Sequence, residues 1–276
     1  MRALIIGLSG QVGDALRPLL APLGAPVFAL SRDAHDDDAT IRWLRGSLQA
    51  MPDLPGSIDT VISLGPLDAF SAWFAHSAPH PLRVVALGST GRTDKRLSGD
   101  ADERALAARL DAAESRLFEA AHAHGSRLTV LRPTMLYGNG RDRSLSPLLH
   151  AARRWRMVPL PRGALGLRQP VHVADVAAAV LACLESPATE GQAFDLPGGE
   201  VLGFDAMLAR ALAIQVPGAR IIRLPGPLFR LAIRLAGSLG AGPVAAGAVS
   251  RLARDQTADP VPARLAFGWN PRAFVP

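Results

Sequence analysis

Short apolar runs alternate with amphipathic stretches along the first two thirds of the chain. The runs span four or five residues and are bounded by Gly, Pro, Asp or Ser, which is typical of parallel strands that are buried on both faces. Between them, apolar residues recur at helical spacing, most clearly over Asp102–His122. This alternation predicts an α/β fold with a doubly wound parallel sheet. The predicted strands are Ala3–Ile6, Val27–Leu30, Val61–Leu64, Arg83–Leu87 and Leu128–Leu131, with a weaker one at Ile41–Leu44.

Prolines break the chain into shorter pieces after about Gly138. Two more strands, Gln192–Leu196 and Ile221–Leu224, are expected to return to the main sheet from this half. We therefore expect a larger domain over residues 1–165, with strands returning to it from later segments, and a smaller lobe over residues 166–276. The helices predicted in the second half are His172–Glu185, Phe204–Ala213, Leu228–Leu239 and Val244–Arg254.

A glycine-rich turn follows the first strand directly and opens a helix that is predicted to run to about Leu20. In such a turn Gly7 makes the tight bend, Gly10 lets a pyrophosphate approach the backbone, and Gly13 lets the helix pack against the strand. The first turn of the helix offers unpaired N–H groups to the phosphates. The residues predicted to bind a dinucleotide here are Gly7, Ser9, Gly10, Gln11, Val12 and Gly13.

The second strand ends in Ser31, Arg32 and Asp33. A free ribose 2′-hydroxyl usually meets a carboxylate at this place, whereas a 2′-phosphate is accommodated by an arginine. Ser31 and Arg32 therefore favour NADP as the cofactor, while Asp33 keeps NAD as the alternative. The other interpretation of Arg32 is that it only caps the strand at the surface.

Three later segments extend this pattern. Together with the glycine-rich turn they resemble the extended short-chain dehydrogenase/reductase family, often called NAD-dependent epimerases/dehydratases. The segments are LRPTMLYG at 131–138, RQPVHVADV at 168–176 and LAFGWNP at 265–271. The resemblance implies a Rossmann-type domain, a nicotinamide cofactor and a small substrate held by the C-terminal lobe. It also places Leu64, Gly65, Pro66 and Pro133 at the cofactor site.

The catalytic pair of that family, a Tyr followed by a Lys four residues later, has no match here. The chain has one Tyr, Tyr137, and one Lys, Lys95, and the two are far apart in sequence. The resemblance places Arg109 near the family lysine as a cofactor contact, but an Arg stays protonated and shuttles protons poorly. Ser89 and Thr90 match the serine that orients the substrate oxygen, and the same loop continues through Lys95 as a polar stretch able to reach the nicotinamide. Ser89, Thr90 and Tyr137 are therefore the catalytic candidates.

The net charge of +6 is made almost entirely of arginine. Arg141, Arg143 and Arg168 flank the substrate cleft that the resemblance implies, and His172 lies in its substrate-lobe segment. These residues suit a phosphate or carboxylate on the substrate, such as a nucleotide sugar, with unpaired surface arginines as the alternative. The basic amphipathic helix over 227–236 is predicted to cover the lobe core or a homodimer contact, with an anionic membrane surface as the other alternative.

Composition excludes several other classes of protein. An apolar fraction of 49% indicates a globular chain rather than a disordered one. One cysteine, Cys183, makes no internal disulfide, and no Cys/His cluster predicts a metal site. The arginines lack the interleaved aromatics that nucleic-acid binding needs. No run of 18 uncharged apolar residues predicts a membrane span, and the apolar N-terminal run is too short for a signal peptide. We therefore expect a cytoplasmic location.

The sequence thus predicts an NADP- or NAD-binding oxidoreductase or epimerase-like enzyme. It would transfer hydride between the nicotinamide and a small carbonyl or hydroxyl substrate, with a rebuilt site for proton transfer. The alternative is a catalytically silent dinucleotide-binding sensor or assembly protein.

Overall fold

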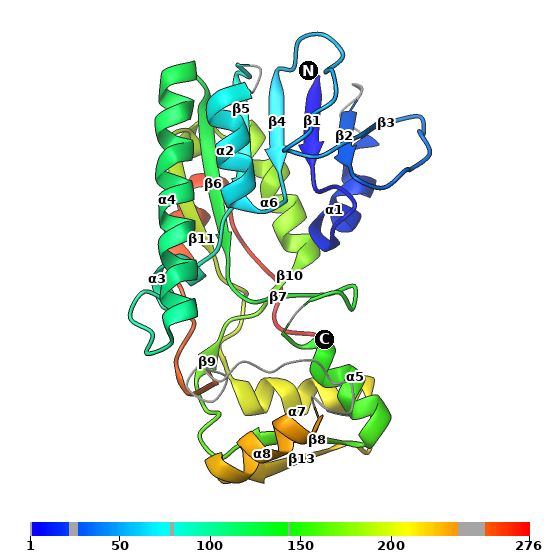
Figure 1. The fold of residues 1–276 in the computed structure, drawn as a ribbon, viewed down its shortest axis with the longest axis vertical. Helices are drawn as coiled ribbons and strands as arrows, with labels where there is room; N and C mark the ends of the chain where they lie inside the picture. The colour runs from blue at the N-terminus through cyan, green and yellow to red at the C-terminus, as the bar shows by residue number, and fades with distance from the viewer. Residues whose placement is uncertain (1, 22–26, 78–79, 143, 237–251) are drawn as a thin grey trace. The chain divides into compact units, whose positions relative to one another are not determined.

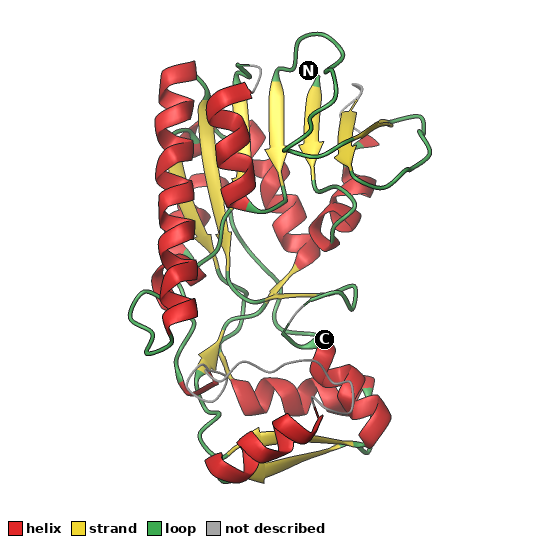
Figure 2. Cartoon of the chain, viewed as in Figure 1, coloured by secondary structure: helices red, strands yellow, loops and turns green. Residues whose placement is uncertain are grey.

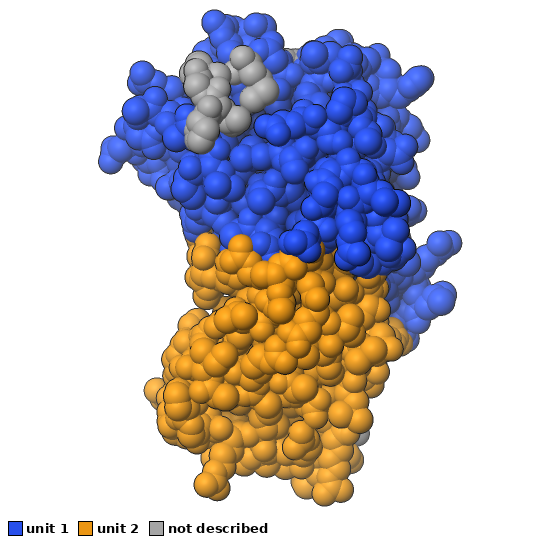
Figure 3. Space-filling view, turned by 180° about the vertical axis from the view of Figure 1, so that it is seen from behind, with its two compact units in different colours: residues 1–133, 173–196, 259–270 blue, residues 134–172, 197–258, 271–276 orange. Residues whose placement is uncertain are grey.

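The computed structural model describes residues 2–21, 27–77, 80–142, 144–236 and 252–276. They form two compact units (Figure 3). Unit 1 consists of residues 1–133, 173–196 and 259–270, and unit 2 of residues 134–172, 197–258 and 271–276. Most of the helix predicted at Val244–Arg254 lies outside the described residues, and the helix predicted at Leu228–Leu239 is described only as far as residue 236.

The compact units change at residue 133, whereas the sequence predicts a boundary at residue 165. Residues 134–172 belong to unit 2 because their helix and short strands pack with later segments of that unit. The chain then returns to unit 1 at residue 173 and again at residue 259. The cofactor and substrate roles given to the two parts of the chain stay predictions.

A seven-stranded parallel sheet forms the centre of unit 1 (Figures 1 and 2). Its strand order is β11-β6-β5-β4-β1-β2-β3. The predicted strands of the first half are all present within two residues of their expected ends, because near-continuous apolar runs suit strands covered on both faces. The strands are β1 (Ala3–Ile6), β2 (Val27–Ser31), β3 (Ile41–Arg45), β4 (Thr60–Ser63), β5 (Arg83–Leu87), β6 (Arg127–Pro133) and β11 (Gln192–Leu196).

Helices cover both faces of this sheet (Figure 1). α2 (Leu67–Ser77) and α4 (Ala101–His124) pack together on one face, and α1 (Gln11–Leu16) and α6 (Val173–Glu185) pack together on the other. α10 (Val261–Phe267) lies against β11. The core under α2 and α4 contains the fully buried side chains of Phe70, Phe74 and Leu117.

Local sequence sets both ends of α4. Its N-terminus is capped by Asp100, whose carboxylate accepts hydrogen bonds from the N–H groups of Asp102 and Glu103. The helix ends at Gly125, which has a φ of +67° and adopts the left-handed conformation without strain. α4 thereby runs from the loop after β5 to the strand β6.

Unit 2 is built from three two-stranded pairings and three described helices. β8 (Met157–Pro161) pairs in parallel with β13 (Arg220–Leu224), so the strand predicted at Ile221–Leu224 does not return to the main sheet, and that prediction was wrong. The physical reason is that Ile221 packs against the separate core of unit 2, beside Val158 and Leu160. The remaining elements are β7 (Leu136–Tyr137) with β10 (Val171–His172), β9 (Leu167–Arg168) with β12 (Leu202–Gly203), and the helices α5 (Ser146–Trp155), α7 (Phe204–Gln215) and α8 (Gly226–Ala236).

A histidine at the end of α4 makes the stability of unit 1 depend on pH. His124 stacks on His80 with 4.3 Å between ring centroids and contacts Phe74. Burial, with a smaller contribution from His80, lowers the pKa of His124 below its ordinary value. Because the folded state then binds this proton less readily than the unfolded chain, we expect the free energy of unfolding to fall as the pH falls below about 6.5.

Urea unfolding at about pH 7.5 and about pH 5.5 measures this loss. His124→Phe keeps a ring against Phe74 but cannot take up the proton. Its stability is therefore expected to fall less between the two pH values. An equal loss of stability in the wild-type protein and in His124→Phe would contradict the assignment of the pH dependence to His124.

Candidate functional site

The strand order of unit 1 reverses at β1. β2 and β3 lie on one side of it and β4, β5 and β6 on the other. In open parallel sheets the loops on either side of such a reversal leave toward opposite faces, and ligands bind in the crevice that opens beyond the carboxyl ends of the strands. The loops that follow β1, β4 and β5 therefore form the candidate site of unit 1.

The glycine-rich turn after β1 has the predicted geometry. Gly7 has a φ of +84°, and its carbonyl accepts a 2.9 Å hydrogen bond from the Gly10 N–H. A β-carbon at Gly13 would lie 2.2 Å from the Leu8 carbonyl oxygen, so only glycine lets α1 approach the turn this closely. Ser9 and Gln11 are partly exposed here. Val12, by contrast, is buried beneath the turn.

The helix after this turn is shorter than predicted. α1 ends at Leu16 and continues as a single 3-10 turn over Arg17–Leu19 rather than as an α-helix to Leu20. Pro18 lies in that turn and has no N–H to donate, so it cannot continue the α-helical hydrogen bonding.

The second glycine of the turn has few close neighbours. A β-carbon at Gly10 would have one neighbouring atom within 4 Å, the Gly7 carbonyl oxygen at 3.1 Å. The turn also touches the end of the next strand, because a β-carbon at Gly7 would lie 3.0 Å from the Gly65 nitrogen. The Leu64 N–H donates to the Ile6 carbonyl at 2.8 Å and holds the two turns together. Pro66 is exposed beside them.

The carboxyl ends of β2 and β3 present two arginines. Ser31 and Arg45 are register partners on the two strands, and Arg32 follows Ser31. Both Arg32 and Arg45 are exposed, and within the described part of the chain neither makes a hydrogen bond or an ion pair with another side chain. The Ser31 hydroxyl bonds the His35 ring at 3.0 Å, and the Asp33 N–H donates to the same hydroxyl.

The loop after β5 places the two hydroxyl-bearing catalytic candidates, Ser89 and Thr90, at the carboxyl edge of the sheet. The Ser89 hydroxyl accepts a 3.1 Å hydrogen bond from the Gly91 N–H. The Thr90 N–H points to the Pro133 carbonyl at 3.4 Å, which brings this loop to the end of β6. Gly91 opens α3 (Gly91–Asp94), a short helix directly after these two residues.

An ion-pair network around the buried carboxylate of Glu114 supports this loop, and it was not predicted from the sequence. Arg132 at the end of β6 donates two hydrogen bonds to the Glu114 carboxylate on α4. Arg92 in the loop donates a third at 2.8 Å and also pairs with Asp111, whose pKa is lowered by the Arg92 hydrogen bond and charge. Asp195 lies 3.5 Å from Arg132. The only sequence signal was that Arg132 directly follows the mostly apolar run over residues 128–131 of β6.

The remaining predicted residues of unit 1 are dispersed. Arg109 is exposed on α4. Pro133 is buried at the end of β6 and contributes its carbonyl to the loop after β5. Their roles toward a cofactor stay predictions.

Tyr137 and His172 meet in unit 2. They lie on the paired strands β7 and β10, with 5.0 Å between ring centroids in an edge-to-face arrangement. Tyr137 is 2% exposed, and its hydroxyl accepts from the Val275 N–H and donates to the Ala273 carbonyl. Tyr137 therefore anchors the C-terminal segment of unit 2 in this structure.

The predicted substrate arginines occupy different environments. Arg168 is 3% exposed, donates to the carbonyls of Leu167 and Arg254, and lies over the Phe204 ring. Arg141 is exposed on the loop before α5, and Arg143 lies outside the described residues. The guanidinium of Arg168 thus joins segments within unit 2.

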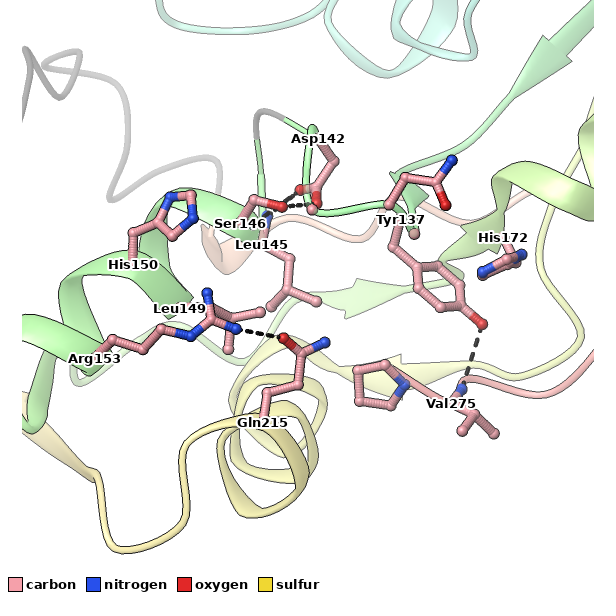
Figure 4. Close-up of a pocket in the computed structure, with 14 residues that line it drawn as sticks. Tyr137, Asp142, Leu145, Ser146, Leu149, His150, Arg153, His172, Gln215 and Val275 are labelled. Carbon is pink, nitrogen blue, oxygen red and sulfur yellow. Dashed lines mark hydrogen bonds between the residues drawn. The ribbon is translucent and has the colours of Figure 1, made fainter. Parts of the chain in front are cut away.

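Unit 2 contains a cavity of about 290 Å³ beside the Tyr137–His172 pair (Figure 4). Arg153 and His150 of α5 reach it from one side, and Arg153 donates a 2.9 Å hydrogen bond to the Gln215 side chain of α7. The Asp142 carboxylate is already bonded to the N–H groups that begin α5 and to the Ser146 hydroxyl. The cavity combines cationic and amide groups suited to a small polar ligand. Its lining residues are Tyr137, Gly138, Asn139, Gly140, Asp142, Leu145, Ser146, Leu149, His150, Arg153, His172, Gln215, Val275 and Pro276.

Two searches of the described residues bear on other kinds of site. No three His, Cys, Asp or Glu side chains among them come together as ligands for a metal ion. None of the described helices combines the length and apolarity needed to cross a membrane.

Relatives were found by sequence and by structure. Residues 107–196 match the NAD dependent epimerase/dehydratase family. The chain is 30% identical over 80 residues to the mitochondrial NADH dehydrogenase [ubiquinone] 1 alpha subcomplex subunit 9 of Dictyostelium discoideum, a match that covers 29% of this chain and 22% of that one. The chain therefore spans about a fifth of the length of this curated relative.

Solved structures match nearly the whole chain. MoeE5 in complex with UDP-glucuronic acid and NAD has a TM-score of 0.71 at 18% identity, covering 99% of this chain and 95% of that one. UDP-glucuronic acid 4-epimerase from Bacillus cereus in complex with NAD has a TM-score of 0.72 at 11% identity, covering 99% and 94%. These likenesses establish a Rossmann-type α/β fold. Residues 107–196, which carry most of α4, then β6 and the segment that leads to β11, are the part of the chain that is similar to the NAD dependent epimerase/dehydratase family.

Proposed function

We propose that unit 1 binds a nicotinamide dinucleotide across the loops that follow β1 and β4. The observation that carries the proposal is the glycine-rich turn at the point where the strand order reverses, where a β-carbon at Gly10 would have only the Gly7 carbonyl oxygen within 4 Å. Gly7, Gly10 and Gly13 would let the pyrophosphate lie against main-chain N–H groups, because no β-carbon stands in the way. The NAD that the two solved structures contain supports this choice of ligand.

The chemistry that follows is hydride transfer with a small carbonyl or hydroxyl compound. A bound nicotinamide supplies the hydride or accepts it. Residues of this chain would orient the substrate oxygen, and Ser89 and Thr90 lie at the carboxyl edge of the sheet where that oxygen is expected. The chain offers no Tyr and Lys four residues apart, so we propose that its proton-transfer group differs from the usual pair.

Separate fluorescence titrations with NADPH and NADH test the cofactor, and a screen of carbonyl compounds for NADPH oxidation tests the reaction. Saturable binding of at least one dinucleotide is expected. If a correctly folded preparation binds neither, the proposal fails.

The arginines at the ends of β2 and β3 lead us to propose a preference for NADP. Arg32 and Arg45 are exposed on neighbouring strands, where a 2′-phosphate would meet them. Arg32→Ala is expected to weaken NADPH binding about tenfold, since a charge-assisted hydrogen bond contributes about 1.5 kcal/mol or more. NADH binding is expected to stay the same.

Arg42→Ala is the matched control for this prediction. Like Arg32, Arg42 is an exposed arginine, but it lies on β3 and pairs with Asp37 at 3.2 Å. Its removal is expected to leave both affinities unchanged. Equal losses for NADPH and NADH in Arg32→Ala would count against a 2′-phosphate contact.

A second candidate function is a dinucleotide-binding component of a larger assembly that does not turn over substrate. The likeness to a protein named as a subunit of NADH dehydrogenase favours it. Tight dinucleotide binding combined with no NADPH oxidation across the carbonyl screen would support this function over catalysis. Turnover of any carbonyl compound would overturn it.

A further inference from the structure

Lysine is used once in this chain, and its position is unusual. The sequence has 30 basic residues, of which Lys95 is the single lysine and the other 29 are arginines. Lys95 directly follows α3, in the loop after β5. The one lysine among these basic residues therefore lies in the loop that carries Ser89 and Thr90.

The Lys95 side chain packs against the same glycine as the Ser89 hydroxyl. A β-carbon at Gly91 would lie 3.1 Å from Ser89 Oγ, 3.6 Å from Lys95 Cε and 3.7 Å from Lys95 Cδ. The end of the lysine side chain therefore folds back over the start of α3, toward the serine. The Lys95 N–H also donates to the Gly91 carbonyl and closes the turn.

The loop that carries Lys95 is firmly held. Thr90 contacts the Pro133 carbonyl, and Arg92 pairs with both Glu114 and Asp111 on α4. In contrast, no residue in the described part of the chain forms a hydrogen bond or an ion pair with the Lys95 ammonium. In this loop Arg92 is therefore already paired with carboxylates, whereas the Lys95 ammonium is available to a ligand.

The location suits contact with a nicotinamide and its substrate. β5 is separated from β1 by one strand, β4, so the carboxyl ends of β5 and β1 lie about 10 Å apart. A dinucleotide with its pyrophosphate on the glycine-rich turn would extend across β4 toward β5. Lysine and arginine differ chemically in the property that matters here, since an ammonium can release its proton and a guanidinium stays protonated.

We propose that Lys95 is the proton donor to the substrate oxygen, with the Ser89 hydroxyl holding that oxygen; this rests on the proposed function. The carbonyl carbon takes the hydride from the reduced nicotinamide and forms a C–H bond. The electron pair of the broken C=O π bond takes a proton from the Lys95 ammonium and forms an O–H bond. The dinucleotide is oxidised, the carbonyl compound is reduced to an alcohol, and the neutral amine regains a proton from water.

Because the chain has one lysine, amine acetylation reports on this residue alone, apart from the N-terminus. Sulfo-NHS-acetate is applied to the protein, and the Lys95 peptide is quantified by mass spectrometry. NADPH or NADH at saturation is expected to slow acetylation at least about tenfold, whereas ADP-ribose, which lacks the nicotinamide, is expected to slow it little. Acetylation at the same rate with a dinucleotide shown to be bound by fluorescence would overturn the proposal.

The second measurement is reduction of 9,10-phenanthrenequinone by NADPH. Lys95→Arg keeps the charge but not the transferable proton, so kcat is expected to fall about 100-fold or more while NADPH affinity stays unchanged. Arg96→Gln, which removes the next, exposed cation, is the matched control and is expected to keep wild-type kcat. Lys95→Arg/Arg96→Lys moves the single lysine by one residue and is expected not to restore activity.

Failure of this inference and failure of the proposed function give different results. Unchanged kcat in Lys95→Arg, or a bound dinucleotide that gives no protection, overturns the role of Lys95 while dinucleotide binding stands. Absence of dinucleotide binding to the wild-type protein overturns the proposed function itself and this inference with it.

Discussion

Replacing Glu114 with alanine is expected to lower the free energy of unfolding by about 3–5 kcal/mol. The Glu114 side chain is 6% exposed and accepts hydrogen bonds from both Arg132 and Arg92. Removal of the carboxylate would leave the Arg132 guanidinium, itself 17% exposed, without its main counter-charge. Such an uncompensated buried charge costs far more than the net contribution of the intact pair. Urea unfolding measures the change.

Two further variants separate the buried charge from other effects. Asp195→Asn removes the more exposed partner of Arg132, at 3.5 Å, and is expected to cost less than about 1 kcal/mol. Glu114→Leu/Arg132→Met removes both charges and is expected to recover part of the lost stability. A loss below about 1 kcal/mol in Glu114→Ala would show that the network does not hold α4 to β6. Because Arg92 shares the carboxylate, the same variant is expected to loosen the loop that carries Ser89.

Gly13→Ala is expected to destabilise unit 1 by about 3 kcal/mol and to abolish dinucleotide binding. The added methyl carbon would lie 2.2 Å from the Leu8 carbonyl oxygen and 2.5 Å from the Leu8 Cα. These are backbone atoms, so the clash is relieved only if α1 moves away from the turn. The movement would displace the N–H groups that we propose to contact the pyrophosphate. Urea unfolding and a fluorescence titration with NADPH measure the two effects.

Gly99→Ala is the matched control, because a β-carbon at Gly99 would meet no atom within 4 Å. It is expected to change stability by no more than about 0.5 kcal/mol and to leave binding unchanged. Wild-type NADPH affinity in Gly13→Ala would contradict the placement of the cofactor on this turn.

The strands of the main sheet were predictable because each is a nearly unbroken apolar run. β1 and β5 agree with the predicted bounds at both ends, and β11 was correctly expected to return to the sheet. β8 was missed because Pro159 and Pro161 hide its apolar pattern. β13 was recognised as a strand but assigned to the wrong sheet, because a short apolar run does not specify its pairing partner.

The candidate site likewise has one part that the sequence predicts and another part that it does not. The glycine spacing after β1 was sufficient to predict a turn that excludes β-carbons, since the requirement is local to seven residues. Glu114 and Arg132 are 18 residues apart, and nothing in either segment indicates that they meet. Their pairing depends on how α4 lies across the end of β6.

The sequence by itself determined that this chain forms a parallel α/β sheet with a tight glycine-rich turn at its first crossover, because apolar periodicity and glycine stereochemistry act over a few residues. Only the tertiary structure decided which side chains share the edge of that sheet. It brought the Lys95 side chain back to Gly91 beside Ser89, and it closed Arg92, Glu114 and Arg132 into one network. Such contacts join segments whose separation along the chain carries no signal, since the packing of helices on strands sets their distances.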